Sequence, residues 1–369
     1  EQLKPGILLA HKRYSYNGKD YIQEKKIKEL QIRLPSIKKT IVFDSTFDSW
    51  NLNSNYWIDF DLESVKFDHP IWVLFSSGTT GKPKAITHGT GGMLLEQYKS
   101  HSLHQNIMNG DRFFWNTTTG WMMWNYAIGS FLCGATLCLY DGSANFPDIG
   151  VQWRFAKDAK INHFGNGSPL FIASMKQNCK DVSNENLKFI KTIGATGSPL
   201  SVEAFKWLQK KLPSTQIISL SGGTDVCSAF IGGCPKLPVY AGFLQCNMLG
   251  ASIKAWDENG KSTKGKTGEL VITEPLPSMP VFFWGDKNFK KYNDSYFAVD
   301  QKVWTHGDWI SIDELRGVLM QGRSDATLNR NGIRIGTSEI YSVLDGIKEI
   351  KASLIIDLNI DGSSKLILF

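Results

Sequence analysis

The sequence lacks the cysteine patterns of a zinc site or a dithiol redox centre. Its six cysteines are spread over 369 residues, and none belongs to a CxxC pair. No basic segment followed by an apolar run opens the chain. We therefore expect reduced thiols and a cytosolic location. The chain also has no tandem repeat and no low-complexity tract.

A strong excess of one charge is missing as well. The chain has 41 Lys and Arg against 35 Asp and Glu, and its formal net charge of +6 is small for its length. The lysines gather mainly between residues 19 and 39, where KKIKELQIRL predicts an amphipathic surface helix. Because no recognised nucleic-acid-binding module accompanies this charge, we expect no nucleic-acid partner.

Only one stretch could be mistaken for a membrane span. Residues 113–140 carry no charge, but a run of asparagine, threonine and glycine at 116–120 interrupts them, and Gly134 breaks the second half. The last four residues, LCLY at 137–140, predict a buried strand. We therefore expect a helix and a strand of a protein core here, and no membrane span.

The rest of the sequence alternates between strand and helix patterns. β-rich apolar runs such as TIVF (40–43), IWVLF (71–75), QIISLS (216–221) and GELVIT (268–273) are separated by helical segments. One of these helices is expected over residues 202–212, with Ser201 as its N-cap. Around Gly260 the pattern changes to glycine-bounded strands, which predict a smaller β subdomain. The expected fold class is α/β.

The most informative segment is FSSGTTGKPK at residues 75–84, which directly follows a predicted buried strand. Two glycines allow successive N–H groups to turn inward, and the loop adds hydroxyl donors and two lysines. Such a loop suits a triphosphate. A Walker A loop has its second glycine five positions after the first, followed directly by Lys and then Ser or Thr. This segment is not such a loop, because Gly81 comes three positions after Gly78 and Pro83 follows Lys82. A solvated lysine-containing turn is the plainer alternative.

Three further motifs follow in order: LSGGTDV (220–226), WTHGDW (304–309) and GRSDATLNRNGIRIG (322–336). Together with FSSGTTGKPK they resemble the adenylate-forming acyl-CoA synthetases. Within that family, SGGTDVCSAF, ATLNR and GIRIGTSEIY are more similar to the acetoacetate-activating branch than to the acetyl or propionyl enzymes. The resemblance covers essentially the whole chain, although members of the family are longer at both ends.

The resemblance implies a large N-terminal domain, with α/β sheets and a β subdomain, followed by the start of a small mobile α+β domain. Residues 1–324 would be the large ATP- and acyl-binding domain without its N-terminal part. Residues 325–369 would be the hinge, at Asp325, and the first part of the small domain. The family's catalytic lysine lies late in that domain in a PKTxxGK-type segment, which does not occur in this sequence.

The implied reaction is ATP-dependent ligation of acetoacetate to coenzyme A through an acyl-adenylate. Thr224 would bond the α-phosphate and Asp225 would bind Mg²⁺, which commonly takes one or two protein carboxylates. A loop aspartate that bonds its own backbone is the plainer alternative for Asp225.

Asp308 would accept hydrogen bonds from the ribose hydroxyls, and an ion pair of Asp308 with Arg323 or Arg334 is the alternative. The implied ATP contacts are Ser77, Thr79, Thr80, Gly81, Lys84, Gly197, Ser198, Pro199, Ser219, Leu220, Ser221, Gly222, Gly223, Thr224, Asp308, Arg323 and Arg334.

The acyl pocket is implied to include Trp121, Met122, Met123, Thr196 and Gly222. Acetyl-specific members carry tryptophan where this chain has Gly222. The absence of the tryptophan ring in this chain leaves room for a four-carbon acid. Plain core packing of residues 121–123 is the alternative. Asn331 and Gly332 are implied to contact coenzyme A.

The expected partners are small molecules, and the sequence indicates no protein partner. Two other functions remain open. The chain could be another short- or medium-chain acyl-CoA synthetase, or a nucleotide-binding remnant without ligase activity.

Overall fold

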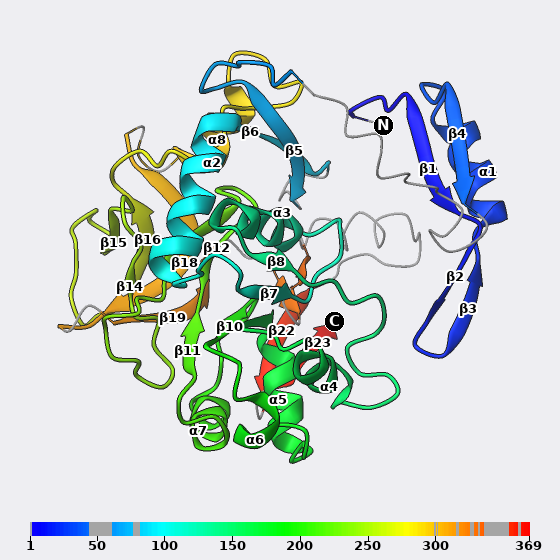
Figure 1. The fold of residues 1–369 in the computed structure, drawn as a ribbon. Coiled ribbons are helices and arrows are strands. Elements are labelled where there is room, and N and C mark those ends of the chain that lie inside the picture. Colours follow the sequence, from blue (N-terminus) through cyan, green and yellow to red (C-terminus); the bar gives the residue numbers. More distant parts are fainter. Residues whose placement is uncertain are drawn as a thin grey trace.

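The computed structural model describes residues 2–43, 61–76, 82–298, 300, 302–314, 317–324, 328–330, 333–335, 354–360 and 363–369. The fold is mixed α/β, as predicted, and Figure 1 shows strands and helices alternating along most of the chain. Within the described residues, no helix is long and apolar enough to cross a membrane.

A five-stranded parallel sheet forms the centre, in the order β11-β10-β9-β7-β8. Its strands are β7 (Arg112–Trp115), β8 (Thr136–Leu137), β9 (His163–Gly167), β10 (Thr192–Thr196) and β11 (Gln216–Ser219). The connecting helices are α3 (Met122–Gly129), 3-10 helix η3 (Ser130–Cys133), α4 (Val151–Asp158), α5 (Ser168–Lys176), α6 (Asn184–Leu187) and α7 (Val202–Lys211). Because the strands are parallel, their carboxyl ends share one edge, where ligands bind in such sheets.

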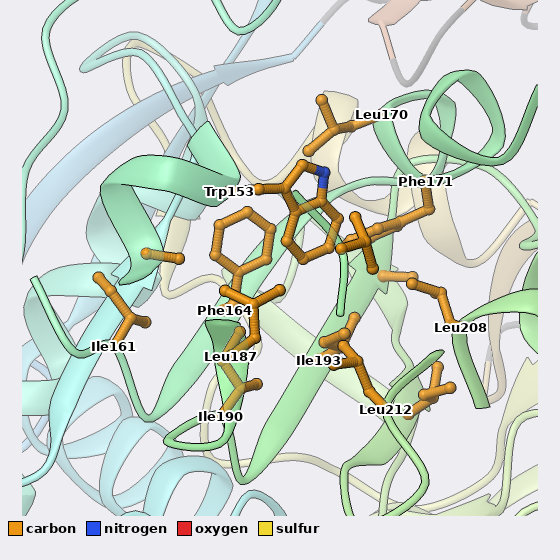
Figure 2. Close-up of a cluster of buried hydrophobic side chains, with 14 of the residues drawn as sticks. Trp153, Ile161, Phe164, Leu170, Phe171, Leu187, Ile190, Ile193, Leu208 and Leu212 are labelled. Carbon is orange, nitrogen blue, oxygen red and sulfur yellow. The ribbon is translucent and has the colours of Figure 1, made fainter. Parts of the chain in front are cut away.

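Aromatic and aliphatic side chains bury one face of this sheet. Trp153 of α4 stacks on Phe164 of β9 with ring centroids 4.6 Å apart. Figure 2 shows these rings beside Ile193 of β10 and Leu208 of α7, all in one buried cluster. Such burial contributes about 1.5–3 kcal/mol for each large apolar side chain.

Three predictions for this region have clear outcomes. The predicted cap is confirmed, because the Ser201 hydroxyl accepts a hydrogen bond from the Ala204 N–H at 3.2 Å. The charge-free stretch supplies helix α3, as expected, and it also supplies most of strand β7, which was not predicted. The prediction of a strand at residues 137–140 is wrong, because β8 ends at Leu137 and Leu139 is exposed.

A second sheet carries both ends of the predicted triphosphate-binding segment at 75–84. It has the order β17-β6-β5, with β5 (Pro70–Ser76), β6 (Lys84–Gly89) and β17 (Phe282–Phe283). Strand β6 leads into α2 (Thr90–Lys99), which continues as a π-helical turn, η2 (Ser100–His104). The predicted strand at 71–75 is confirmed, but it is not buried, since β5 is the edge strand and Ile71 and Phe75 are exposed.

The predicted β subdomain is a four-stranded antiparallel sheet in the order β15-β16-β18-β19. Its strands are Ile253–Trp256, Gly268–Ile272, Trp304–Ile312 and Val318–Arg323. A smaller antiparallel sheet precedes it, with β12 (Ser221–Gly223), β13 (Ser228–Gly232) and β14 (Cys246–Asn247). Helix α8 (Lys290–Tyr296) contacts β17 and β18 and so joins two of the sheets.

The chain ends form small separate units. At the N-terminal end, β1 (Ile7–His11) pairs in parallel with β4 (Lys39–Phe43), β2 (Arg13–Tyr16) forms a hairpin with β3 (Lys19–Ile22), and α1 (Glu24–Arg33) is the predicted surface helix. Figure 1 shows these elements at one side of the molecule. Beyond β19, β20 (Leu328–Arg330) pairs with β21 (Ile333–Ile335), and β22 (Ile355–Ile360) pairs with β23 (Ser363–Leu368).

Candidate functional site

The segments after β10 and β11 meet at the carboxyl edge of the parallel sheet. The Thr196 hydroxyl donates to the Leu220 carbonyl at 3.0 Å, and the Leu220 N–H donates to the Ala195 carbonyl at 2.9 Å. The predicted ATP contacts at 197–199 and the SGGTD segment (221–225) therefore lie beside each other. This places two separate sequence motifs at one site.

Two features define the backbone of the segment at 197–199. Gly197 has φ of +86°, a left-handed conformation that favours glycine. The carbonyl of the next residue, Ser198, accepts a hydrogen bond from the Ser168 hydroxyl at 2.6 Å. Ser168 is the first residue of α5, so the N-terminal end of this helix anchors the segment. Sequence reasoning did not identify Ser168, because a serine at a helix start is ordinarily a cap.

An ion pair at the site joins two predicted residues. The Lys84 ammonium lies 2.6 Å from Asp225 Oδ1, and the side chains are 24% and 4% exposed. Lys84 begins β6, and Asp225 lies in the turn between β12 and β13. A buried carboxylate needs a compensating charge, and Lys84 supplies it. The aspartate therefore does not merely bond its own backbone, which was the plainer alternative.

Aromatic rings surround this ion pair. The Tyr296 hydroxyl donates to the same Asp225 Oδ1 at 2.6 Å. The Lys84 ammonium lies 4.9 Å from the centroid of the Tyr296 ring and 5.9 Å from that of Phe283, both within cation–π range. Tyr296 in turn stacks on Trp304, with centroids 3.6 Å apart and planes 13° apart.

A buried histidine holds the backbone of the same aspartate. His88 Nε2 donates to the Asp225 carbonyl at 3.0 Å. Burial lowers the pKa of His88 from 6.5 to about 4, and the hydrogen bond to Asp225 only partly offsets this effect. His88 is therefore a neutral donor at neutral pH.

The predicted ribose carboxylate lies on β18, next to the same aromatic cluster. Asp308 is buried and faces Arg323 of β19 in the strand register. Gly307 has φ of +85°, and its N–H donates to Glu269 Oε1 at 3.0 Å. The backbone before Asp308 is therefore fixed in a conformation that favours glycine.

His306 also belongs to this part of the site. It accepts a hydrogen bond at Nδ1 from Trp304 Nε1 at 3.3 Å, and its Nε2 lies 3.6 Å from Asp308 Oδ2. A continuous set of contacts thus runs from Asp225 through Tyr296, Trp304 and His306 to Asp308, which joins the metal and ribose candidates.

The acyl-pocket candidates lie around the start of α3. Met123 is buried in one cluster with Leu220 and Ala229, while Met122 packs against the outside of this cluster. Ala229 is the strand partner of Gly222. The structure thus brings the predicted methionines close to the predicted glycine, although Met123 itself is a core residue.

The backbone packing around Gly222 leaves no space for a side chain, which the sequence did not reveal. A Cβ atom at this position would lie 2.0 Å from the Ser228 carbonyl oxygen and 2.5 Å from the Ala229 Cα. Both are backbone atoms of β13, so a side chain would push β12 and β13 apart. The role of Gly222 in setting acyl length stays a prediction.

Some predicted residues cannot be placed in the site. Ser77, Thr79, Thr80, Gly81, Asp325, Asn331 and Gly332 lie outside the described residues, and for Arg323 and Arg334 only the strands are described. Tyr296 and His88 are the main residues that sequence reasoning missed. The aromatic spacing of Tyr292 and Tyr296 on one helix was a weak signal, because it is equally typical of core packing.

Comparisons with known proteins identify the family of this chain. The family model for AMP-binding enzymes matches residues 5–280. The chain is 37% identical to an acetoacetyl-CoA synthetase of Gallus gallus, over 100% of this chain and 58% of that protein. It is also 37% identical to acetoacetyl-coenzyme A synthetase of Rhizobium meliloti (strain 1021), over 100% of this chain and 59% of that protein.

A solved structure of an acetoacetyl-CoA synthetase also matches the fold of this chain. Acetoacetyl-CoA synthetase from Streptomyces lividans is 39% identical and matches with a TM-score of 0.82, over 100% of this chain and 58% of that one. The chain thus spans somewhat more than half the length of the relatives it matches. It is homologous to acetoacetyl-CoA synthetases over its full length and belongs to the family of AMP-binding enzymes.

Proposed function

We propose that the protein ligates acetoacetate to coenzyme A at the expense of ATP. In the first step the acid's carboxylate attacks the α-phosphorus of ATP and pyrophosphate leaves. In the second step the thiol of coenzyme A attacks the acyl-adenylate and AMP leaves. The observation that carries the proposal is the buried pair of Lys84 and Asp225 beside the SGGTD backbone, in a chain homologous to acetoacetyl-CoA synthetases.

The first step brings two anions together, so the site must offset their repulsion. Lys84 supplies a positive charge that can serve a phosphate group, and the hydroxyl of Thr224 supplies a donor for the α-phosphate. Asp308 would hold the ribose, and the backbone around Gly197 would hold the adenine. Positioning by these groups suits phosphoryl-type chemistry, which needs little covalent help from the protein.

The donor set fits Mg²⁺. Asp225 is a buried carboxylate that already binds a cation, the Lys84 ammonium, at 2.6 Å. Mg²⁺ prefers oxygen ligands and is commonly held by one or two carboxylates together with phosphate oxygens. When bound, it would neutralise charge on the triphosphate. Asp225 would be the residue that holds it.

The remaining roles follow from the same proposal. Gly222, Thr196, Trp121 and the methionines next to Trp121 would line the acyl site. Asn331 and Gly332 would meet coenzyme A, and Asp325 would be the hinge between the two steps. Residues 1–324 would form the large domain, and the protein would act in the cytosol.

The test measures pyrophosphate release and acyl-CoA formation by the full-length protein with acetate, butyrate, 3-hydroxybutyrate and acetoacetate. We expect acetoacetate to be the best substrate and Asp225→Asn to raise the Mg²⁺ requirement strongly. A preference for another acid would assign the protein to a different acyl-CoA synthetase. ATP binding without pyrophosphate release from any acid would leave a nucleotide-binding protein without ligase activity.

A further inference from the structure

Tyr296 makes a contact that its position in the sequence does not explain. It is the last residue of α8 and is only 3% exposed. Its hydroxyl donates to Asp225 Oδ1 at 2.6 Å, across 71 residues of sequence. A core tyrosine could satisfy its hydroxyl with any carbonyl, whereas this one bonds the carboxylate proposed to bind Mg²⁺.

The ring of Tyr296 is held on several sides. It stacks on Trp304 with centroids 3.6 Å apart, and it meets Tyr292 and Phe283 edge to face at 5.2 and 5.6 Å. Stacked and edge-to-face pairs fix ring orientation. The hydroxyl of Tyr296 therefore stays in place unless the whole aromatic cluster moves.

Lys84 shares the same carboxylate oxygen but is held differently. Its side chain is 24% exposed, against 4% for Asp225. Its stem is flexible, and its ammonium faces the rings of Tyr296 and Phe283 only through cation–π contacts. Lys84 can therefore move away from Asp225 Oδ1, whereas Tyr296 cannot.

We infer that Tyr296 is a positioning residue for the Asp225 carboxylate and that Lys84 is the exchangeable cation on it. Lys84 leaves the carboxylate when a divalent cation arrives with the nucleotide, and it then serves the phosphates. Tyr296 keeps the carboxylate oriented through this exchange. The inference rests on the proposed function, because it takes Asp225 as the residue that binds the metal.

A hydrogen bond to a metal-binding carboxylate orients that carboxylate and so supports metal affinity. Loss of such a supporting bond typically weakens metal binding about 10–100-fold. Tyr296→Phe removes the hydroxyl and keeps the ring with its stacking on Trp304. Tyr292→Phe is the matched control, because it removes a hydroxyl from the same helix and the same aromatic cluster.

The experiment measures Mn²⁺ binding to the full-length protein by electron paramagnetic resonance, with a non-cleavable α,β-methylene ATP analogue present. We expect the Mn²⁺ dissociation constant to rise about 10-fold or more in Tyr296→Phe and to stay at the wild-type value in Tyr292→Phe. A purely structural tyrosine would lower the thermal unfolding midpoint and leave this constant unchanged. Wild-type Mn²⁺ affinity in folded Tyr296→Phe would therefore overturn the inference.

Two further variants separate this inference from the proposed function. If Asp225→Asn leaves Mn²⁺ binding unchanged, the metal role of Asp225 itself is wrong. If Asp225→Asn weakens binding and Tyr296→Phe does not, only the role of Tyr296 is wrong. Lys84→Met removes the competing cation, so Mn²⁺ without nucleotide should bind this variant more tightly than the wild type. Equal binding would refute the exchange.

Discussion

Acidification should weaken this fold through His88, the buried histidine behind the metal candidate. His88 lies on β6, and its Nε2 donates to the Asp225 carbonyl at 3.0 Å. Burial lowers its pKa from 6.5 to about 4, because an imidazolium in this position would lose its hydration. The folded protein therefore keeps His88 neutral at pH values where the unfolded chain protonates it.

The sign of the effect follows from this difference. Below pH 6.5 the unfolded chain binds a proton that the folded protein does not bind until the pH approaches about 4. Stability that is fully present above pH 6.5 is therefore lost as the pH falls through this window. At pH 5 the two pKa values correspond to a loss of about 2 kcal/mol from this one residue.

The variant His88→Gln isolates the effect. The glutamine amide can keep a donor toward the Asp225 carbonyl, and it does not titrate. We would measure the free energy of unfolding in urea at pH 7.5 and pH 5, with tryptophan fluorescence as the signal. The wild type should lose about 2 kcal/mol more than the variant between these pH values.

The other buried histidines do not disturb this comparison. Burial also lowers the pKa of His101 to about 4, and it lowers the pKa of His104 and of His163, so these residues add their own losses of stability at low pH. Those losses are the same in wild type and in His88→Gln, and they cancel in the difference. An equal fall in stability for both proteins would refute the reasoning about His88.

Three further outcomes are expected. Gly222→Ala should destabilise the protein by about 1–3 kcal/mol or more through overpacking, because its Cβ would lie 2.0 Å from the Ser228 carbonyl oxygen. Gly120→Ala is the control and should leave the thermal midpoint unchanged, because the atom nearest to its Cβ would be 3.9 Å away. Equal midpoints for both variants would contradict this reasoning. Asp308→Ala should weaken ATP binding in calorimetry, and unchanged binding would remove Asp308 from the ribose site. Ser201→Ala should cost about 1 kcal/mol through the lost cap, and no change in urea unfolding would show that the cap contributes nothing.

Local rules account for much of the fold. The cap at Ser201, the strand at residues 216–219, and the β subdomain predicted around Gly260 all follow from propensities and short-range patterns. The pairing of the segments after β10 and β11 was also predictable, because parallel strands place their carboxyl ends together. These features depend on residues that are close in sequence or on the rules of one sheet type.

Burial was harder to predict than strand formation. IWVLF at 71–75 is apolar enough for a central strand, yet β5 is an edge strand with Ile71 and Phe75 exposed. Whether a strand has neighbours on both sides depends on which segments pair with it, and the run itself carries no such information. For the same reason the run at 137–140 did not reveal that β8 would end at Leu137.

The pairing of charged side chains at the site was also not predictable from the separate motifs. Lys84 was assigned to the phosphates because it ends a loop rich in glycine and hydroxyl donors, and Asp225 was assigned to a metal. The structure joins them, although they lie 141 positions apart in the sequence, and it adds Tyr296 from a third element. A carboxylate that is 4% exposed cannot stay charged without a partner, so the fold must bring a cation to it before any metal does. The same lysine can therefore stabilise the folded site and later serve the nucleotide, and no motif read by itself could have assigned it both roles.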